Sequence, residues 1–432
     1  MKKLLCFLFL PLMLCGCSLN MSIDTLLTPP KLSEQQQQIY NALKSYTGAN
    51  ISLKYPKSGN YLSAFIIDDI DGDSDNEAIV FYEKNTMSAE KNSLRINVLD
   101  QDEAGWKSVY DHAADGAELE KIVITTLGEN ERSSIIVGYS LINQSEKVVS
   151  IYDYVDGKLR TTFENNYYSM FEAADFNGDG KNELFMALGQ NASREAAASI
   201  YTPNSEGVYV RSYVKLSESF NDYQKASACL LENGEYGIYL DASTSGGSII
   251  TAVLSVDENN VLKAVFLPDE EKQETLRPQG YTCRDADGDG KLEIPVPRIA
   301  LGYDEDDTNA MYITQFMGVT ENGLEEKYEG YVSISGGYVF ILPENWENTT
   351  VVNRSLGEIS FCRFDGEINE ASSDIFSLRT VQDRNSAESL LNSGDYSLLH
   401  ARGDNYFLIR INEKDSLIQS PAEFMFRFRF DV

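Results

Sequence analysis

The chain has 432 residues, with 36 Lys and Arg against 67 Asp and Glu and a formal net charge of −31. Its 42% hydrophobic content is enough for a large core, and at roughly 150 residues per domain the length indicates two or three domains. The acid excess argues against binding of nucleic acid, whose phosphates need clustered Lys and Arg, and against a polybasic membrane contact. Only two histidines, His112 and His400, are present, which leaves little room for imidazole catalysis or a His-rich zinc site.

The N-terminus has the pattern of a secretory signal. Lys2 and Lys3 precede an apolar run from Leu4 to Leu14, which is too short for a spanning helix. The next residues, Leu14-Cys15-Gly16-Cys17, resemble a bacterial lipobox, in which Cys17 is diacylated (palmitate-type chains) and becomes the mature N-terminus. Residues 1–17 are therefore expected to be a lipoprotein signal peptide, and two acyl chains would anchor the protein on the extracytoplasmic face of the cell membrane. An ordinary signal peptide with an accidental cysteine is the alternative.

Residues 18–50 are expected to form a tether followed by a short helix. The tether contains a Thr-Pro-Pro stretch and shows no periodicity. Ser33-Glu34-Gln35-Gln36 is typical of a capping box at a helix start. Ile39 and Leu43 then fall on one helix face, and Gly48 suits the helix end.

Three cysteines, Cys229, Cys283 and Cys362, remain beyond the signal. Their odd number and irregular spacing favour buried free thiols over a disulfide.

The rest of the chain shows an internal repeat of about 53 to 55 residues. Acidic segments that share one pattern begin at Asp69, Asp175 and Asp285, at nearly regular spacing. Halfway between them, around residues 122–137 and 226–239, lie segments of similar architecture that have lost the acids. Each unit contains a short apolar strand, the loop, a second strand and a hairpin with Asp, Asn or Gly at its turn.

Four antiparallel strands in a unit of this length predict an all-β fold, with a β-propeller of about five four-stranded blades over residues 51–332. Closure of the ring would leave no unpaired edge. Residues 333–432 lose the pattern, and we expect them to form a separate C-terminal α+β domain. The alternative is that they supply two degenerate blades, which would give seven.

The acidic segments have the composition of cation-binding loops. Positions 1, 3 and 5 offer side-chain oxygens, position 7 offers a backbone carbonyl, and position 9 is Glu. Hard cations, calcium above all, need such alternation of oxygen ligands. Position 12 is Val80, Met186 or Val296, which excludes an EF-hand. The candidate metal ligands are Asp69, Asp71, Asp73, Asp75, Glu77, Asp175, Asn177, Asp179, Lys181, Glu183, Asp285, Asp287, Asp289, Lys291 and Glu293.

These loops set the expected role of calcium. Regular spacing between predicted strands favours three calcium sites that stabilise the fold on one side of the disc; three solvated acidic turns are the alternative. Ser74 stands in the first loop where the others have Gly180 and Gly290, which permit a positive φ.

On these loops and their flanking strands, the chain resembles the FG-GAP/VCBS repeats of integrin-type β-propellers. With Leu26–Leu32 and Leu53–Gly59 it is also similar to uncharacterised Gram-positive lipoproteins that carry VCBS-type repeats. The resemblance implies that the acidic residues of the three loops are calcium ligands, and it gives no ligand in the two degenerate repeats. It brings no assigned activity.

The sequence contains no nucleophile elbow, His-Glu-x-x-His, Gly-rich phosphate loop or cysteine pair with zinc spacing, and it points to no catalytic residue. We therefore expect a lipid-anchored calcium-binding propeller that acts as a binding module at the cell envelope, with a cell-wall glycan or a surface protein as its partner. An envelope scaffold without a soluble ligand is one alternative. A carbohydrate-active enzyme that uses two carboxylates is the other.

Overall fold

The computed structural model describes residues 32–430 apart from 49, 85–93, 131, 192, 218–219, 221, 269–273, 321, 345, 347, 356, 369–373, 413–424 and 426. Cys17, the expected signal peptide and most of the expected tether lie outside these residues. Within the described part of the chain, no helix combines the length and apolar character needed to span a membrane.

Helix α2 (Glu34–Thr47) opens the described chain. The Ser33 hydroxyl accepts a hydrogen bond from the backbone N–H of Gln36 at 3.1 Å, and the Gln36 side chain accepts one from Ser33 at 3.1 Å. Ile39 and Leu43 are fully buried, and Gly48 ends the helix in the left-handed conformation. The helix, its capping box and its buried face are therefore as the sequence predicts.

The described strands form six sheets, four-stranded or five-stranded. The first sheet contains β1 (Ile51–Leu53), β2 (Phe65–Asp68), β3 (Glu77–Lys84), β4 (Leu94–Asp102) and β5 (Gly105–Ala113). The second contains β6 (Glu118–Thr125), β7 (Ser134–Ser140), β8 (Lys147–Val155) and β9 (Lys158–Tyr168). The third contains β10 (Met170–Ala174), β11 (Glu183–Leu188), β12 (Ala197–Pro203) and β13 (Tyr209–Lys215).

The remaining sheets follow in chain order. The fourth contains β14 (Asp222–Leu230), β15 (Tyr236–Ser243), β16 (Ile249–Val256) and β17 (Leu262–Phe266). The fifth contains β18 (Ile294–Ile299), β19 (Tyr312–Thr320), β20 (Gly323–Ser333), β21 (Tyr338–Ile341) and β27 (Phe428–Phe430). The sixth contains β22 (Thr349–Ser355), β23 (Glu358–Arg363), β24 (Asp374–Val381), β25 (Ser397–Arg402) and β26 (Asn405–Ile411), with helix α3 (Arg384–Asn392) between β24 and β25.

Sheets one to five repeat one topology, in which successive strands pair antiparallel in chain order. In the first sheet β1 and β2 pair with opposite ends of β3 and together occupy the place of a single first strand. In sheets two to four, hairpins join the third and fourth strands at the predicted turns; Asp156 and Gly157, for example, both have positive φ, as a two-residue hairpin turn requires. In the fifth sheet the predicted turn before Gly323 joins the second and third strands, β19 and β20. The five expected repeats thus correspond to five sheets.

The hydrophobic core is divided among the interfaces between neighbouring sheets. Ile79 of the first sheet and Tyr152 of the second share one buried cluster, and Ile136 and Leu184 belong to the cluster between sheets two and three. Equivalent clusters join sheets three and four, four and five, and five and six. Each sheet therefore packs face to face on its neighbours in the chain.

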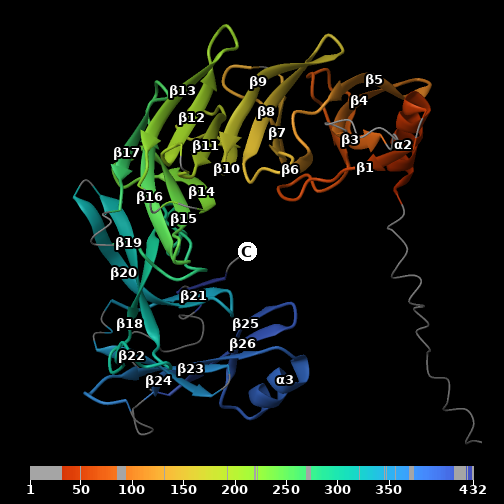
Figure 1. Cartoon of the computed structure of the whole chain (residues 1–432). Helices are drawn as coiled ribbons and strands as arrows, with labels where there is room; N and C mark the ends of the chain where they lie inside the picture. Colours follow the sequence, from red (N-terminus) through yellow and green to blue (C-terminus); the bar gives the residue numbers. More distant parts are fainter. Residues whose placement is uncertain are drawn as a thin grey trace, which may run out of the picture.

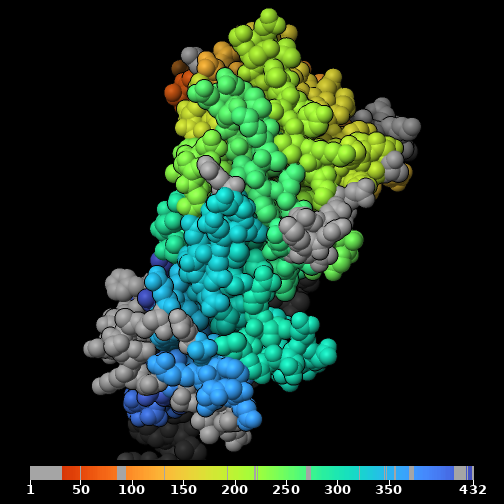
Figure 2. Space-filling view, turned by 90° about the vertical axis from the view of Figure 1, so that its left-hand side faces the viewer, coloured from red at the N-terminus to blue at the C-terminus, as the bar shows by residue number. Residues whose placement is uncertain are grey.

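Figure 1 shows the six sheets following one another along an open arc, with α2 and the first sheet at one end and β22–β26 at the other. The first strands β6, β10 and β14 lie on the inner side of the arc, and the fourth strands β9, β13 and β17 lie on the outer side. Figure 2 shows the outer side, where sheets three to six form one continuous surface from top to bottom. The arrangement is mostly β and antiparallel, as expected, but the expected closed ring is not seen among the described residues.

The expected domain boundary at residue 332 falls within the fifth sheet. β21 lies beyond that boundary yet completes the fifth sheet by pairing with β20, and β27 from the end of the chain pairs with β21. Phe428 of β27 packs on Phe340 of β21, with ring centroids 4.9 Å apart. Long-range pairing of this kind has no local sequence signal, because the two strands are separated by the whole sixth sheet.

Candidate functional site

The three acidic loops occupy equivalent places in the fold. Two of them connect the first strands of a sheet, β2 to β3 and β10 to β11. The third precedes β18, and an antiparallel bridge between Arg284 and Glu293 pairs the two sides of this loop in the same way. The degenerate segments around Gly128 and Asn233 occupy the same place between the first two strands of sheets two and four. The regular spacing in the sequence thus reflects one topological position in successive sheets.

The first aspartate of each loop organises the backbone. Asp69, Asp175 and Asp285 each accept hydrogen bonds from the N–H groups of loop positions 4 and 6. The distances are 2.7 and 3.0 Å in the first loop, 2.6 and 2.9 Å in the second and 2.6 and 2.9 Å in the third. The side chains at positions 3 and 5 also accept hydrogen bonds, each from the N–H two residues later. Three separate sequences therefore adopt one loop conformation.

The glutamate at position 9 closes each loop from inside. Glu77, Glu183 and Glu293 are at most 3% exposed, and each accepts a hydrogen bond from the N–H of position 2 at 2.9 to 3.1 Å. Burial raises the pKa of each of these carboxyl groups to about 7. A buried carboxylate with no cation beside it is costly, so a divalent ion in the loop would favour the charged form.

Carboxylates converge in two of the three loops. One oxygen each from Asp69, Asp71 and Glu77 lies within 4.8 Å of the others, and the same holds for Asp285, Asp287 and Asp289. Burial, and then the nearby carboxylates, raise the pKa values of Asp71 and Asp287. In the second loop the middle position is Asn177, and no such acid triplet forms there among the described residues.

Residue type at position 6, and not backbone conformation, separates the first loop from the other two. At position 6, Gly180 and Gly290 have φ of 83° and 86°, in the left-handed region that glycine adopts without strain. Ser74 has φ of 78° at the same position. The first loop therefore keeps the common conformation even where its side chain disfavours it.

The lysine at position 7 links each later loop to the preceding sheet. Lys181 forms an ion pair with Glu129 at 2.7 Å, and Lys291 forms one with Glu232 at 2.8 Å. Lys327 of β20 also contacts Glu232. Glu129 and Glu232 lie in the degenerate segments of sheets two and four. Both lysines are predicted ligands through their backbone carbonyls only, and no local sequence signal points to these side-chain partners.

The following sheet packs against the other side of the second loop. A Cβ on Gly178 would lie 2.1 Å from the ring of Tyr236 on β15, so only glycine fits there. The Asn177 amide donates to Asn260, in the β16–β17 turn, at 3.0 Å. In the third loop, Arg429 of β27 donates to the backbone carbonyl of Asp287. The loops are thus held between sheets and are not free surface turns.

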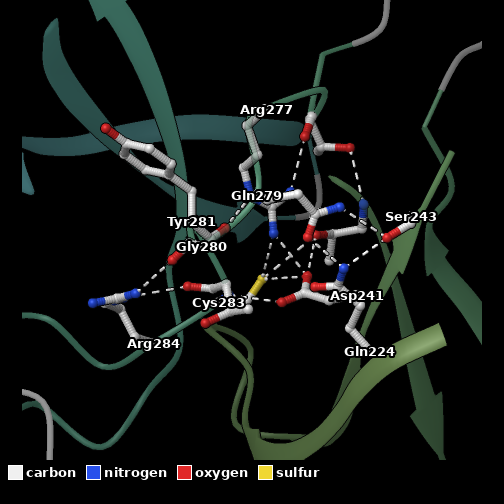
Figure 3. A network of polar contacts seen from close by, with 12 residues as sticks. Gln224, Asp241, Ser243, Arg277, Gln279, Gly280, Tyr281, Cys283 and Arg284 are labelled. Atoms are coloured by element: carbon white, nitrogen blue, oxygen red, sulfur yellow. Dashed lines mark hydrogen bonds and ion pairs between the residues drawn. The ribbon is translucent and has the colours of Figure 1, made fainter. Parts of the chain in front are cut away.

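A second polar cluster, shown in Figure 3, lies between sheets four and five. Arg277 and Asp241 are 0% and 1% exposed and form an ion pair at 2.7 Å. Asp241 also accepts hydrogen bonds from the backbone N–H and the thiol of Cys283, at 2.8 and 3.1 Å. Burial raises the pKa of the Cys283 thiol, which keeps it protonated. The cluster joins the connection between the two sheets to β15. Cys283 and Cys362 are buried free thiols, as expected, whereas Cys229 is free but only partly buried.

No known protein family and no curated protein matches the chain. Among solved structures, it is similar over 66% of its length to a "putative exo-beta-1,3-galactanase" from Bifidobacterium bifidum s17, with 9% identity, a TM-score of 0.23 and 93% of that chain covered. It is likewise similar over 66% of its length to a hypothetical protein from Leishmania major, with 10% identity, a TM-score of 0.23 and 91% of that chain covered. Likeness at this level carries no argument about fold or function, which must come from the residues of this chain.

Proposed function

We propose that the protein is a calcium-binding module of the cell envelope in which the three acidic loops hold structural calcium ions. The observation that carries this proposal is the same set of backbone and side-chain hydrogen bonds in three loops of different sequence. The loops project carboxylate or amide oxygens at positions 1, 3 and 5 and close on a buried glutamate, which suits a hard cation with oxygen ligands.

Calcium explains the concentration of charge in these loops. The first loop alone carries Asp69, Asp71, Asp73, Asp75 and Glu77, and no Lys or Arg of the described chain forms an ion pair with any of them. Neutralisation of this repulsion would add stability. An ion present at about ten times its dissociation constant contributes on the order of 1.4 kcal/mol per site.

We further propose that sheets one to five are propeller blades. Their common strand order, the inner position of the first strands β6, β10 and β14 and the shared cores between neighbouring sheets support this. The cellular part is that acyl chains on Cys17 hold the module on the extracytoplasmic membrane face, where it binds a cell-wall glycan or a surface protein. Mass spectrometry of the protein from its native membrane tests this part: a mature N-terminus other than acylated Cys17 would contradict it.

The calcium sites are tested by thermal unfolding of wild type and Asp179→Asn in calcium and in chelator. Asn keeps the oxygen that accepts the hydrogen bond from Lys181 but removes the charge. We expect calcium to raise the melting temperature of wild type, and the variant to lose part of this gain while unfolding like wild type in chelator.

Asp257→Asn is the matched control, because Asp257 accepts similar backbone hydrogen bonds in a turn outside the loops. Its calcium response should equal that of wild type. An equal loss for Asp179→Asn in calcium and in chelator, or no calcium response of wild type, would contradict the proposal.

A further inference from the structure

Two adjoining cavities form a groove on the inner side of the arc. The first, of 610 Å³, extends over β6, β10 and the start of β14. The second, of 620 Å³, lies between the β7–β8 and β11–β12 connections. Both are lined by Lys147, Tyr168 and Ser169, so they are continuous, and each has the size of a small-ligand site. Because successive strands alternate in direction, the β7–β8 and β11–β12 connections lie at the strand ends opposite to those that carry the acidic loops.

The basic side chains of the groove are already neutralised. Lys147 pairs with Glu120 at 2.7 Å, Lys121 pairs with Glu172 at 2.6 Å, and Arg194 pairs with Glu146. An anionic ligand would find no unpaired cation here, unlike at a phosphate-binding site. Among the acids that line the groove, only Asp222, exposed on β14, has no basic partner in the described part of the chain. The walls therefore favour a ligand without net charge.

The other lining groups suit a ligand rich in hydroxyls. Asn60, Gln144 and Gln190 offer amide groups that both donate and accept hydrogen bonds. Gln224, at the edge of the groove, is fixed by Ser243 and Gln279 of the neighbouring network at 2.6 Å each (Figure 3). Tyr167 is 39% exposed on the groove wall, and the Arg194 guanidinium lies 4.4 Å from its ring centroid. A sugar combines these needs, because it has an apolar ring face for an aromatic side chain and a rim of hydroxyls.

One buried hydroxyl in the groove lacks a partner. Tyr168 is 6% exposed, lines both cavities, and has no hydrogen-bond partner for its hydroxyl within the described structure. A Cβ on Gly138 would lie 2.2 Å from this hydroxyl, so the glycine makes room for it. Buried polar groups are nearly always paired, so an unpaired one requires an explanation, and a ligand group that pairs with it is one.

We propose that this groove binds a segment of a neutral oligosaccharide. The inference deepens the proposed binding role at the cell envelope by naming a site and a ligand class, and it uses none of the calcium loop residues. Tyr167 supplies a ring for stacking, Tyr168 a buried hydroxyl, and the amides hydrogen bonds to the sugar rim.

The test is isothermal titration of the purified protein with neutral tetrasaccharides of N-acetylglucosamine, glucose, galactose and mannose, in calcium and in chelator. We expect at least one to bind. Tyr167→Ala should weaken that binding about tenfold or more. Tyr168→Phe removes only the unpaired hydroxyl, so it should weaken binding about fivefold while leaving the melting temperature unchanged or higher.

Tyr213→Ala is the matched control. Tyr213 is 60% exposed on β13 with Arg211 at 4.5 Å from its ring, but it does not line the groove, so sugar binding should be unchanged. Two results would overturn the proposal: no binding of any of the four sugars, or wild-type binding by both groove variants. If no sugar binds but calcium raises the melting temperature, the sugar proposal is wrong and the calcium proposal stands. If a sugar binds but calcium has no effect on the melting temperature, the calcium proposal is wrong and the sugar proposal stands.

Discussion

Single residues decide how well each acidic loop fits its shared conformation. Ser74 has a positive φ at a position where the other two loops have glycine. A side chain with a Cβ pays about 1 to 2 kcal/mol in this region, partly offset by the greater freedom that glycine has in the unfolded chain. The first loop therefore carries local strain that its two relatives avoid.

Replacement of this serine should stabilise the protein. We expect Ser74→Gly to raise the free energy of unfolding by up to about 1 kcal/mol, as measured by urea denaturation. The reverse change, Gly180→Ser, should lower it by a similar amount, because a Cβ on Gly180 meets no atom within 4 Å and only backbone strain changes. Equal stability of the two variants would show that the loops do not share one backbone requirement.

The buried ion pair of Arg277 with Asp241 should make a large contribution to stability. Arg277→Met would leave Asp241 buried without its cation, and we expect a loss of about 3 to 5 kcal/mol in urea denaturation. The exposed pair of Arg160 with Asp156 is the control, and Arg160→Ala should cost less than about 1 kcal/mol. A loss at Arg277 no larger than at Arg160 would contradict the stabilising role of the buried ion pair.

At the scale of elements, the sixth sheet contains a polar cluster that resembles the one around Asp241. Asp374 of β24 pairs with Arg354 at 2.6 Å and accepts hydrogen bonds from the Cys362 thiol at 3.1 Å and from Ser360 at 3.0 Å. Burial alone would raise the pKa of Asp374, but these three donors outweigh burial and hold it below its ordinary value. The cluster therefore ties three neighbouring strands through one ionised carboxylate.

This lowered pKa makes the sheet sensitive to acid. Since the pKa of Asp374 is lower in the folded than in the unfolded chain, its contribution is present above the ordinary pKa of about 3.9 and is lost as the pH falls through the folded value. Asp374→Asn should therefore be less stable than wild type at pH 6, and the difference in melting temperature should shrink toward pH 3. Asp156→Asn, at an exposed turn, is the control. A difference that stays constant with pH would contradict this role.

At the scale of the whole molecule, stability depends on a series of interfaces between neighbouring sheets. Each inner sheet shares a buried cluster with the sheets before and after it, while the first and sixth sheets lie at the ends of the arc. In such an arrangement, stability is approximately a sum of nearest-neighbour terms, and units at the ends are supported from one side only.

Native-state hydrogen exchange should reveal this gradient. We expect the highest protection in β11, β12, β15 and β16 of the central sheets and lower protection in the sixth sheet, because local opening there breaks one interface instead of two. The matched strands β23 and β24 provide the comparison. Equal protection throughout, together with a radius of gyration from X-ray scattering below that of the open arc, would indicate that the ring closes in solution.

The sequence by itself determined the local features. The capping box at Ser33, the hairpin turn at Asp156 and Gly157, the free cysteines and the position of the acidic loops between paired strands all depend on short-range rules, and all are found in the structure. The internal repeat allowed more than local features to be predicted, because one pattern seen several times indicates the same strand order in every unit that carries it.

Only the tertiary structure decided how the units come together. The pairing of β27 with β21, the contacts of Lys181 and Lys291 with Glu129 and Glu232, and the groove around Tyr168 all join residues far apart in the chain. Such contacts follow from the angle and distance between packed sheets, which depend on how complete side chains fill the space between them. For the same reason the sequence predicted the antiparallel four-stranded units but not the open arc in which the sheets are arranged.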